Sequence, residues 1–121
     1  MQDFYLFLER MGGLHDCQIS SLRWDQESCW IELVLDDLYS NFVGLSEYPG
    51  REKGSIKLMD VERATFDIET AAGLRIYEIC PSKERANTVD LKFSPSGAIS
   101  VTCKKAVYPE CRLTSLQPKK G

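Results

Sequence analysis

The single histidine of the chain, His15, has the most distinctive chemistry in the sequence. An imidazole paired with a carboxylate can form the orienting half of a catalytic triad, or can shuttle protons near neutral pH. The strand register derived below places Asp37 opposite His15, so these two residues are the catalytic candidates if the protein is an enzyme. No serine or cysteine lies in a nucleophile motif such as G-x-S-x-G. The other interpretation is structural, because a histidine that begins a strand often satisfies neighbouring backbone groups.

Asp16 and Asp36 are weak metal candidates. The same register places them opposite one another, which is unfavourable for like charges unless a cation or a basic side chain lies between them. Calcium could occupy that position, although the spacing does not match an EF-hand loop. A zinc site would need several cysteines, and no two of these have ligand-pair spacing. We expect no metal and no other cofactor, and the two acids are then solvated or paired with a local Arg or Lys.

The segment 39–54, YSNFVGLSEYPGREKG, is the longest without clear periodicity. Loops of this length are uncommon in compact domains and are enriched in binding roles. Its aromatic residues suit a protein interface, and the neighbouring acids favour a basic partner. The other interpretation is a lid whose aromatic side chains cover an open end of the sheet core. The binding candidates are Asp36, Asp37, Tyr39, Asn41, Phe42, Glu47 and Tyr48.

The first predicted hairpin, 17–24 with 28–37, decides where these residues lie. Alternation fails in its first strand, because Cys17 and Ile19 share one phase whereas Leu22 and Trp24 share the other. A β-bulge at Ser20-Ser21 restores a single inner face. With a turn at 25–28, the predicted pairs are Trp24 with Cys29, Leu22 with Ile31, Ile19 with Leu33, Cys17 with Leu35, His15 with Asp37 and Asp16 with Asp36.

The remaining elements follow from periodicity. A helix is predicted over about 3–11, with Asp3 as N-cap and an apolar stripe at Phe4, Phe7, Leu8 and Met11. After Gly12-Gly13 the period changes to two. The clearest hairpin joins 88–94 to 98–104 through Ser94-Pro95-Ser96-Gly97. A further hairpin through 70–73 would join 64–68 to 74–79, and the strand 74–79 is predicted to be central because both of its phases are apolar.

These elements predict a single α+β domain, mostly β, over residues 1–121. We expect a short N-terminal helix (about 3–11) packed on a bent antiparallel meander sheet of roughly six to eight strands, as a sandwich or a partly open barrel. The β body covers about 14–112, and about 113–121 form a frayed tail. The chain is long enough to bury a core of its own.

Composition narrows the class of protein. The chain has 43% hydrophobic and 27% charged residues and a net charge of -3, values typical of a globular protein. This balance does not favour nucleic acid as a partner, and no apolar run is long enough to span a membrane. The N-terminus lacks the features of a secretory signal, and the five cysteines are odd in number without a C-x-x-C pair. We therefore expect a cytoplasmic protein with reduced core thiols.

Leu14-His15-Asp16-Cys17 follows the predicted helix and opens a strand. This segment resembles the start of several families of small bacterial β-rich proteins with a Leu-His-Asp signature, some of them grouped with immunity proteins of polymorphic toxin systems. The resemblance implies a non-enzymatic protein that binds and neutralises a toxin, with His15 and Asp16 as structural members. Non-catalytic protein binding is therefore the expected function. The alternative is a small hydrolase or a ligand-binding β-barrel with a His/Asp cluster at its mouth.

Overall fold

The computed structural model describes residues 1–69 and 73–111. Its N-terminal helix, α1 (Gln2–Arg10), buries Phe4, Phe7 and Leu8 as the stripe predicted. Asp3 lies in the first turn of α1, whose N-cap is Met1, so the predicted N-cap was wrong. A short 3-10 turn, η1 (Gly12–Leu14), then leads into the strands. The predicted tail, about 113–121, lies outside the described residues.

Eight strands and a second 3-10 turn make up the rest of the described chain. They are β1 (Ile19–Asp25), β2 (Trp30–Leu35), η2 (Ser40–Phe42), β3 (Gly54–Met59), β4 (Arg63–Asp67), β5 (Arg75–Pro81), β6 (Thr88–Ser94), β7 (Ala98–Thr102) and β8 (Lys105–Val107). The strands form two antiparallel sheets of four, in the orders β1-β2-β3-β8 and β4-β7-β6-β5. The predicted mostly-β fold with one N-terminal helix is confirmed, and the sheets do not close into a barrel. The meander order holds within β1-β2-β3 and β5-β6-β7, whereas β4 pairs with β7 and β8 pairs with β3, so neither lies beside a strand that is next to it in the sequence.

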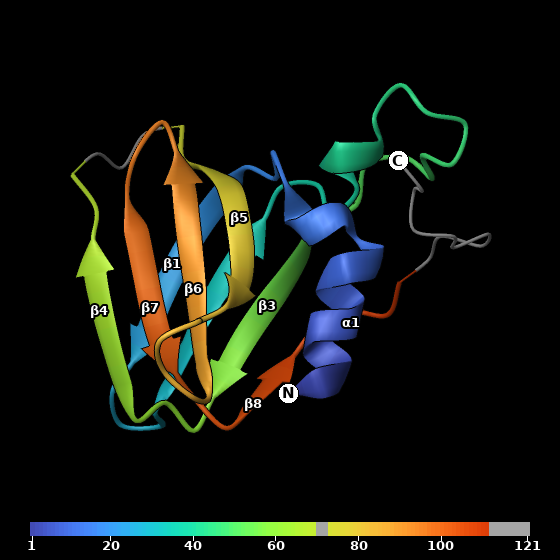
Figure 1. The fold of residues 1–121 in the computed structure, drawn as a ribbon. Coiled ribbons are helices and arrows are strands. Elements are labelled where there is room, and N and C mark those ends of the chain that lie inside the picture. Colours follow the sequence, from blue (N-terminus) through green and yellow to red (C-terminus); the bar gives the residue numbers. More distant parts are fainter. Residues whose placement is uncertain (70–72, 112–121) are drawn as a thin grey trace.

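The two sheets form two layers, and their inner faces enclose one core (Figure 1). In β2 the side chains of Ile31, Leu33 and Leu35 are buried and alternate with half-buried residues. This is the period-two pattern of a sheet with one covered face. Helix α1 stands beside the two layers and extends the core through Phe4 and Phe7, which contact the ring of Tyr108 at 5.5 and 4.6 Å between centroids.

The first hairpin, β1 with β2, contains the predicted bulge, but its strands pair in a different register from the predicted one. Pairing shifts between Ile19 and Ser21, which confirms the extra residue at Ser20. However, Ile19 faces Leu35 instead of Leu33, Leu22 faces Leu33 and Trp24 faces Ile31, so the predicted pairs of these three residues were each wrong by two residues. The turn lies one residue later than expected, at 26–29, with Asp25 paired to Trp30 and with the Asp25 carboxylate accepting a hydrogen bond from the amide of Ser28. Cys29, predicted to be a core residue, is therefore an exposed turn residue.

The hairpin of β6 and β7 is confirmed, with Val89 opposite Val101 and Leu91 opposite Ile99 on the buried face. The predicted hairpin through 70–73 was wrong, because β4 pairs with β7 and β5 pairs with β6. Residues 70–72 themselves lie outside the described part of the chain. Strand β5 is at a sheet edge, not central as predicted. A bulge between Ile76 and Glu78 changes its phase, so apolar residues of both phases reach one face.

Candidate functional site

The loop that joins β2 to β3 is held together by the carboxylate of Asp37. This side chain is only 8% exposed. Its Oδ1 accepts hydrogen bonds from the amides of Tyr39 (3.0 Å) and Glu52 (3.1 Å), and its Oδ2 accepts one from the hydroxyl of Tyr48 (2.6 Å). The hydrogen bond to Asp37, with a contribution from burial, raises the pKa of Tyr48 above its usual value. Asp37 therefore ties the beginning, the middle and the end of the loop to one point.

The aromatic residues of the loop point into the protein. Tyr39 is fully buried and Phe42 is 9% exposed, and both belong to the core cluster. The side-chain amide of Asn41 donates to the carbonyl of Gly12 at 3.4 Å, which connects the loop to the turn after α1. Tyr39, Asn41 and Phe42 thus hold the loop on the body of the protein, as the lid interpretation expects. Val43, by contrast, is 61% exposed beyond them.

A shallow hollow of about 400 Å³ lies at the foot of this loop. Asp36 stands on its rim in an ion pair with Arg51, at 2.8 Å between Oδ2 and Nη2. The arginine pairing that was one alternative for Asp36 is therefore present. Glu47, another binding candidate, is exposed nearby in the sequence, with Oε1 accepting from the hydroxyl of Ser46 at 3.2 Å. The residues that line the hollow are Asp16, Gln18, Asp36, Asp37, Ser40, Val43, Tyr48, Arg51 and Arg75.

His15 lies beside β5 and not opposite Asp37, because the register of the first hairpin differs from the predicted one. Its Nδ1 donates to the carbonyl of Tyr77 at 2.9 Å, and its ring meets the Tyr77 ring edge-on at 5.8 Å. Its Nε2 is 3.6 Å from the carboxylate of Asp16. His15 therefore provides a hydrogen-bond donor to a backbone carbonyl, which is what the structural interpretation of this residue predicts. The expected dyad with Asp37 is not formed.

The predicted pairing of Asp16 with Asp36 is also wrong. Asp16 donates its amide to the carbonyl of Ile76 and so belongs to the edge of β5, whereas Asp36 donates its amide to the carbonyl of Gln18. Both side chains reach the same hollow from different directions. Within residues 1–69 and 73–111, no group of three or more His, Cys, Asp or Glu side chains is placed to hold a metal ion.

The thiol of Cys17, two residues after His15, is unsuited to nucleophilic chemistry. Cys17 is fully buried, and its Sγ lies 3.7 Å from the carbonyl oxygen of Leu38. Burial raises the pKa of this thiol to about 12. A thiol with such a pKa is almost entirely protonated near neutral pH, and the protonated form is a poor nucleophile.

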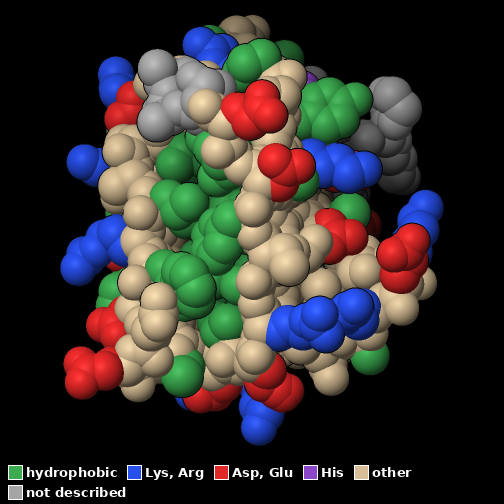
Figure 2. All heavy atoms as spheres, turned by 90° about the vertical axis from the view of Figure 1, so that its left-hand side faces the viewer, with side chains coloured by type: hydrophobic (Ala, Val, Ile, Leu, Met, Phe, Trp, Pro, Cys, Tyr) green, Lys and Arg blue, Asp and Glu red, His purple; other side chains and the backbone are tan. Residues whose placement is uncertain are grey.

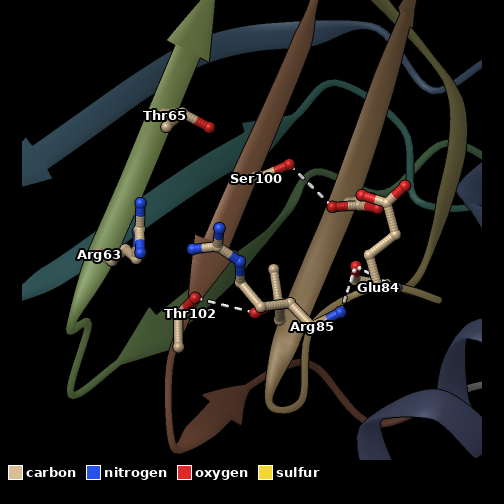
Figure 3. Close-up of a pocket in the computed structure, with 9 residues that line it drawn as sticks. Arg63, Thr65, Glu84, Arg85, Ser100 and Thr102 are labelled. Carbon is tan, nitrogen blue, oxygen red and sulfur yellow. Dashed lines mark hydrogen bonds between the residues drawn. The ribbon is translucent and has the colours of Figure 1, made fainter.

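A second, polar hollow of about 200 Å³ lies on the outer face of the other sheet (Figure 3). Arg85 extends from the loop between β5 and β6 toward β4, where Arg63 stands. Hydroxyl groups form the floor, with Thr88 and Thr102 hydrogen-bonded at 2.8 Å. In the described part of the chain neither arginine forms an ion pair. Guanidinium groups placed in this way can receive a carboxylate or a phosphate. This region was not predicted from the sequence, because the pairing of β4 with β7 that creates it is not apparent from local periodicity.

Comparisons of the chain with protein family models, with curated proteins and with solved structures gave no match. Among the helices that the structure describes, none has the length and apolar character needed to cross a membrane.

Proposed function

We propose that the protein is a non-catalytic protein-binding domain whose contact surface is the loop 36–54 with the hollow at its foot. The clamp at Asp37 is the observation that supports this most strongly. Long loops are normally mobile, and ordering them on binding costs conformational entropy. Here the hydrogen bonds to Asp37 order the loop before any partner binds, so that entropic cost is already met. The loop projects from the body of the protein at the upper right of Figure 1, and Val43 on it is 61% exposed.

The contact residues in this proposal differ from the aromatic ones first considered. Tyr39 and Phe42 support the loop from below, while Val43 offers an exposed apolar contact beside the hollow. Asp16 adds a carboxylate whose side chain is 57% exposed. A partner with a small apolar patch and a Lys or Arg side chain would complement these groups. A basic toxin, as implied by the resemblance to immunity proteins, meets that description.

The surroundings of His15 favour binding over hydrolysis. A hydrolase of the kind considered needs an imidazole oriented by a carboxylate and facing a nucleophile. His15 instead donates to a backbone carbonyl, Asp37 is engaged with the loop, and the neighbouring Cys17 thiol is buried. The open sheets also lack the closed mouth that a ligand-binding barrel would provide.

Two exposed valines allow a matched test. Val43 is 61% exposed on the loop and Val107 is 55% exposed on β8, so the same substitution can be made at both. The probe is the purified product of the gene immediately upstream, tested by calorimetry and by co-expression in growing cells. We expect Val43→Asp to weaken binding at least about tenfold and to abolish protection from a toxic probe, whereas Val107→Asp leaves both unchanged.

Two results would contradict the proposal. One is failure of the wild-type chain to bind the probe, which counts against the toxin-neutralising role. The other is binding that both valine variants weaken equally, which would place the contact surface away from the loop. Circular dichroism of each variant checks that the fold is retained.

A further inference from the structure

In the described residues the two sheets have four edge strands, and three of them carry a feature that obstructs further pairing. Strand β1 is bulged between Ile19 and Ser21, and β5 is bulged between Ile76 and Glu78. Strand β8 is only three residues long. Bulges and short length are the usual means by which proteins prevent edge-to-edge association. Strand β4 has neither, since its five residues pair with β7 in unbroken register.

The sequence of β4, Arg63-Ala64-Thr65-Phe66-Asp67, is complementary to itself in the antiparallel direction. A two-fold axis at the central Thr65 places Arg63 opposite Asp67 of a second copy, and Ala64 opposite Phe66. Each pair lies on one face of the sheet, with charges outside and apolar groups inside. Opposite charges and apolar pairs across neighbouring strands are stabilising. In the described residues neither Arg63 nor Asp67 has an ion-pair partner within its own chain.

An exposed apolar seam adjoins this edge. Figure 2 shows hydrophobic side chains in a strip between two ridges of backbone, on the side of the molecule where β4 and β1 lie. Trp24 of β1 is 50% exposed and Phe66 of β4 is 37% exposed, with ring centroids 5.2 Å apart. Contiguous exposed apolar surface on a soluble protein commonly marks a protein contact. Half-buried Ile19, Leu22, Val61, Ala64 and Ile68 continue the apolar character around these rings.

We propose that two copies of the chain pair through β4 about a two-fold axis at Thr65, forming one continuous sheet of eight strands across the dimer. A second copy of the chain then accounts for three features of β4: its unbulged edge, the charges of Arg63 and Asp67, and the apolar surface at Phe66. A two-fold contact uses the same patch on both subunits and closes after two copies, so it does not lead to fibres. Strand β4 lies on the side of the molecule away from the projecting loop in Figure 1, so the dimer is independent of partner binding at that loop.

The proposal is tested by reversing the charge of Arg63 or Asp67 on β4 singly, and then by exchanging the two charges in a double variant. Sedimentation velocity of the full chain from about 1 to 100 µM should show twice the 13.7 kDa mass of the monomer. Arg63→Asp and Asp67→Arg should each raise the dissociation constant at least tenfold, about 1.4 kcal/mol or more, because each creates two like-charge pairs per dimer. The double variant, with Arg63→Asp and Asp67→Arg together, restores opposite charges and should restore the dimer. Glu69→Arg, an acid just beyond β4, should leave it intact.

Three outcomes would overturn the proposal. These are a monomeric wild-type chain over this range, a double variant that dissociates like the single variants, and a dimer broken by Glu69→Arg but not by Asp67→Arg. Val43→Asp serves as a second control, because it should leave the dimer unchanged whether or not the loop binds a partner. Failure of the dimer and failure of the loop as a binding surface are thus separable.

Discussion

At the residue scale, Asp36 and Asp37 are adjacent carboxylates in contrasting surroundings. Asp36 pairs with Arg51, whose side chain is 69% exposed, and exposed ion pairs of this kind contribute little to stability. Asp37 is buried and accepts hydrogen bonds from three groups of the loop. Removing a buried acceptor leaves its donors without partners, which costs their desolvation. The two positions therefore offer a direct comparison of a surface charge with a structural one.

Asp37→Ala is expected to lower the free energy of unfolding by about 2 to 4 kcal/mol, and Asp36→Ala by less than about 1 kcal/mol. Urea denaturation of both variants measures this difference. Hydrogen exchange at the amides of Tyr39 and Glu52 should accelerate in Asp37→Ala only. Equal losses of stability in the two variants would show that Asp37 is not the residue that holds the loop.

The five thiols differ in exposure, and the two buried ones have a raised pKa, which predicts which of them reacts first. Burial raises the pKa of Cys17 to about 12 and that of Cys103 to about 11, while Cys29 is exposed in the β1–β2 turn. A higher thiol pKa means less thiolate at a given pH, so Cys17 and Cys103 should not react at about pH 8 until the protein unfolds. A colorimetric thiol reagent should give one fast phase in the native protein. Cys29→Ser should remove that phase, and its persistence would assign it to another cysteine.

At the element scale, local chemistry made some features predictable. The β6–β7 hairpin and the helix follow from residues close together in the sequence, such as Pro95 and Gly97 at the turn. The bulge at Ser20 was predictable because it alone restores one apolar face. The partner of β4 was not predictable, since β7 lies some thirty residues further along the chain and nothing local selects it over β5.

The candidate site was predictable in location but not in detail. The predicted hairpin places Asp36 and Asp37 at one end, beside the loop that carries Tyr48, and these three residues do line one hollow. A register shift of two residues was enough to separate His15 from Asp37. The inward direction of Tyr39 and Phe42 depends on the core left open by the two sheets, which periodicity in a loop does not reveal. The seam at Trp24 was missed because Trp24 was assigned to a covered inner face, whereas β1 is an edge strand.

The turn between β6 and β7 supports a test at this scale. Gly97 has a φ of +116°, and a Cβ there would lie 3.2 Å from the carbonyl oxygen of Asp67 on β4. Gly97→Ala should therefore destabilise the protein by about 1 to 3 kcal/mol. The exposed neighbour Ser96→Ala should change stability by no more than about 0.5 kcal/mol. Urea denaturation measures both stability changes from the midpoints, provided that the slopes of the transitions are unchanged. Equal midpoints for Gly97→Ala and Ser96→Ala would contradict the backbone strain expected for alanine at position 97.

At the scale of the whole molecule, the two sheets share a single core. Leu33 of β2 and Val101 of β7 come from different sheets, yet both are essentially fully buried in one cluster that also includes residues of α1. The two sheets also meet at the chain just before β1, where Gln18 bridges to Arg75 of β5 and the amide of Ile19 donates to the carbonyl of Leu74 at 2.9 Å. Two layers joined in this way should unfold as one cooperative unit.

Substitutions in either sheet should consequently shift the same transition. Leu33→Ala is expected to cost about 2 to 5 kcal/mol and Val101→Ala about 2 kcal/mol. Both tryptophans lie in the sheet of Leu33, Trp24 on β1 and Trp30 on β2, so their fluorescence reports that sheet, while far-ultraviolet circular dichroism reports both. At a fixed protein concentration the two signals should give coincident urea transitions in both variants. If Val101→Ala moved the dichroism transition without the fluorescence transition, the sheets would be separate folding units, and the shared core would not couple them.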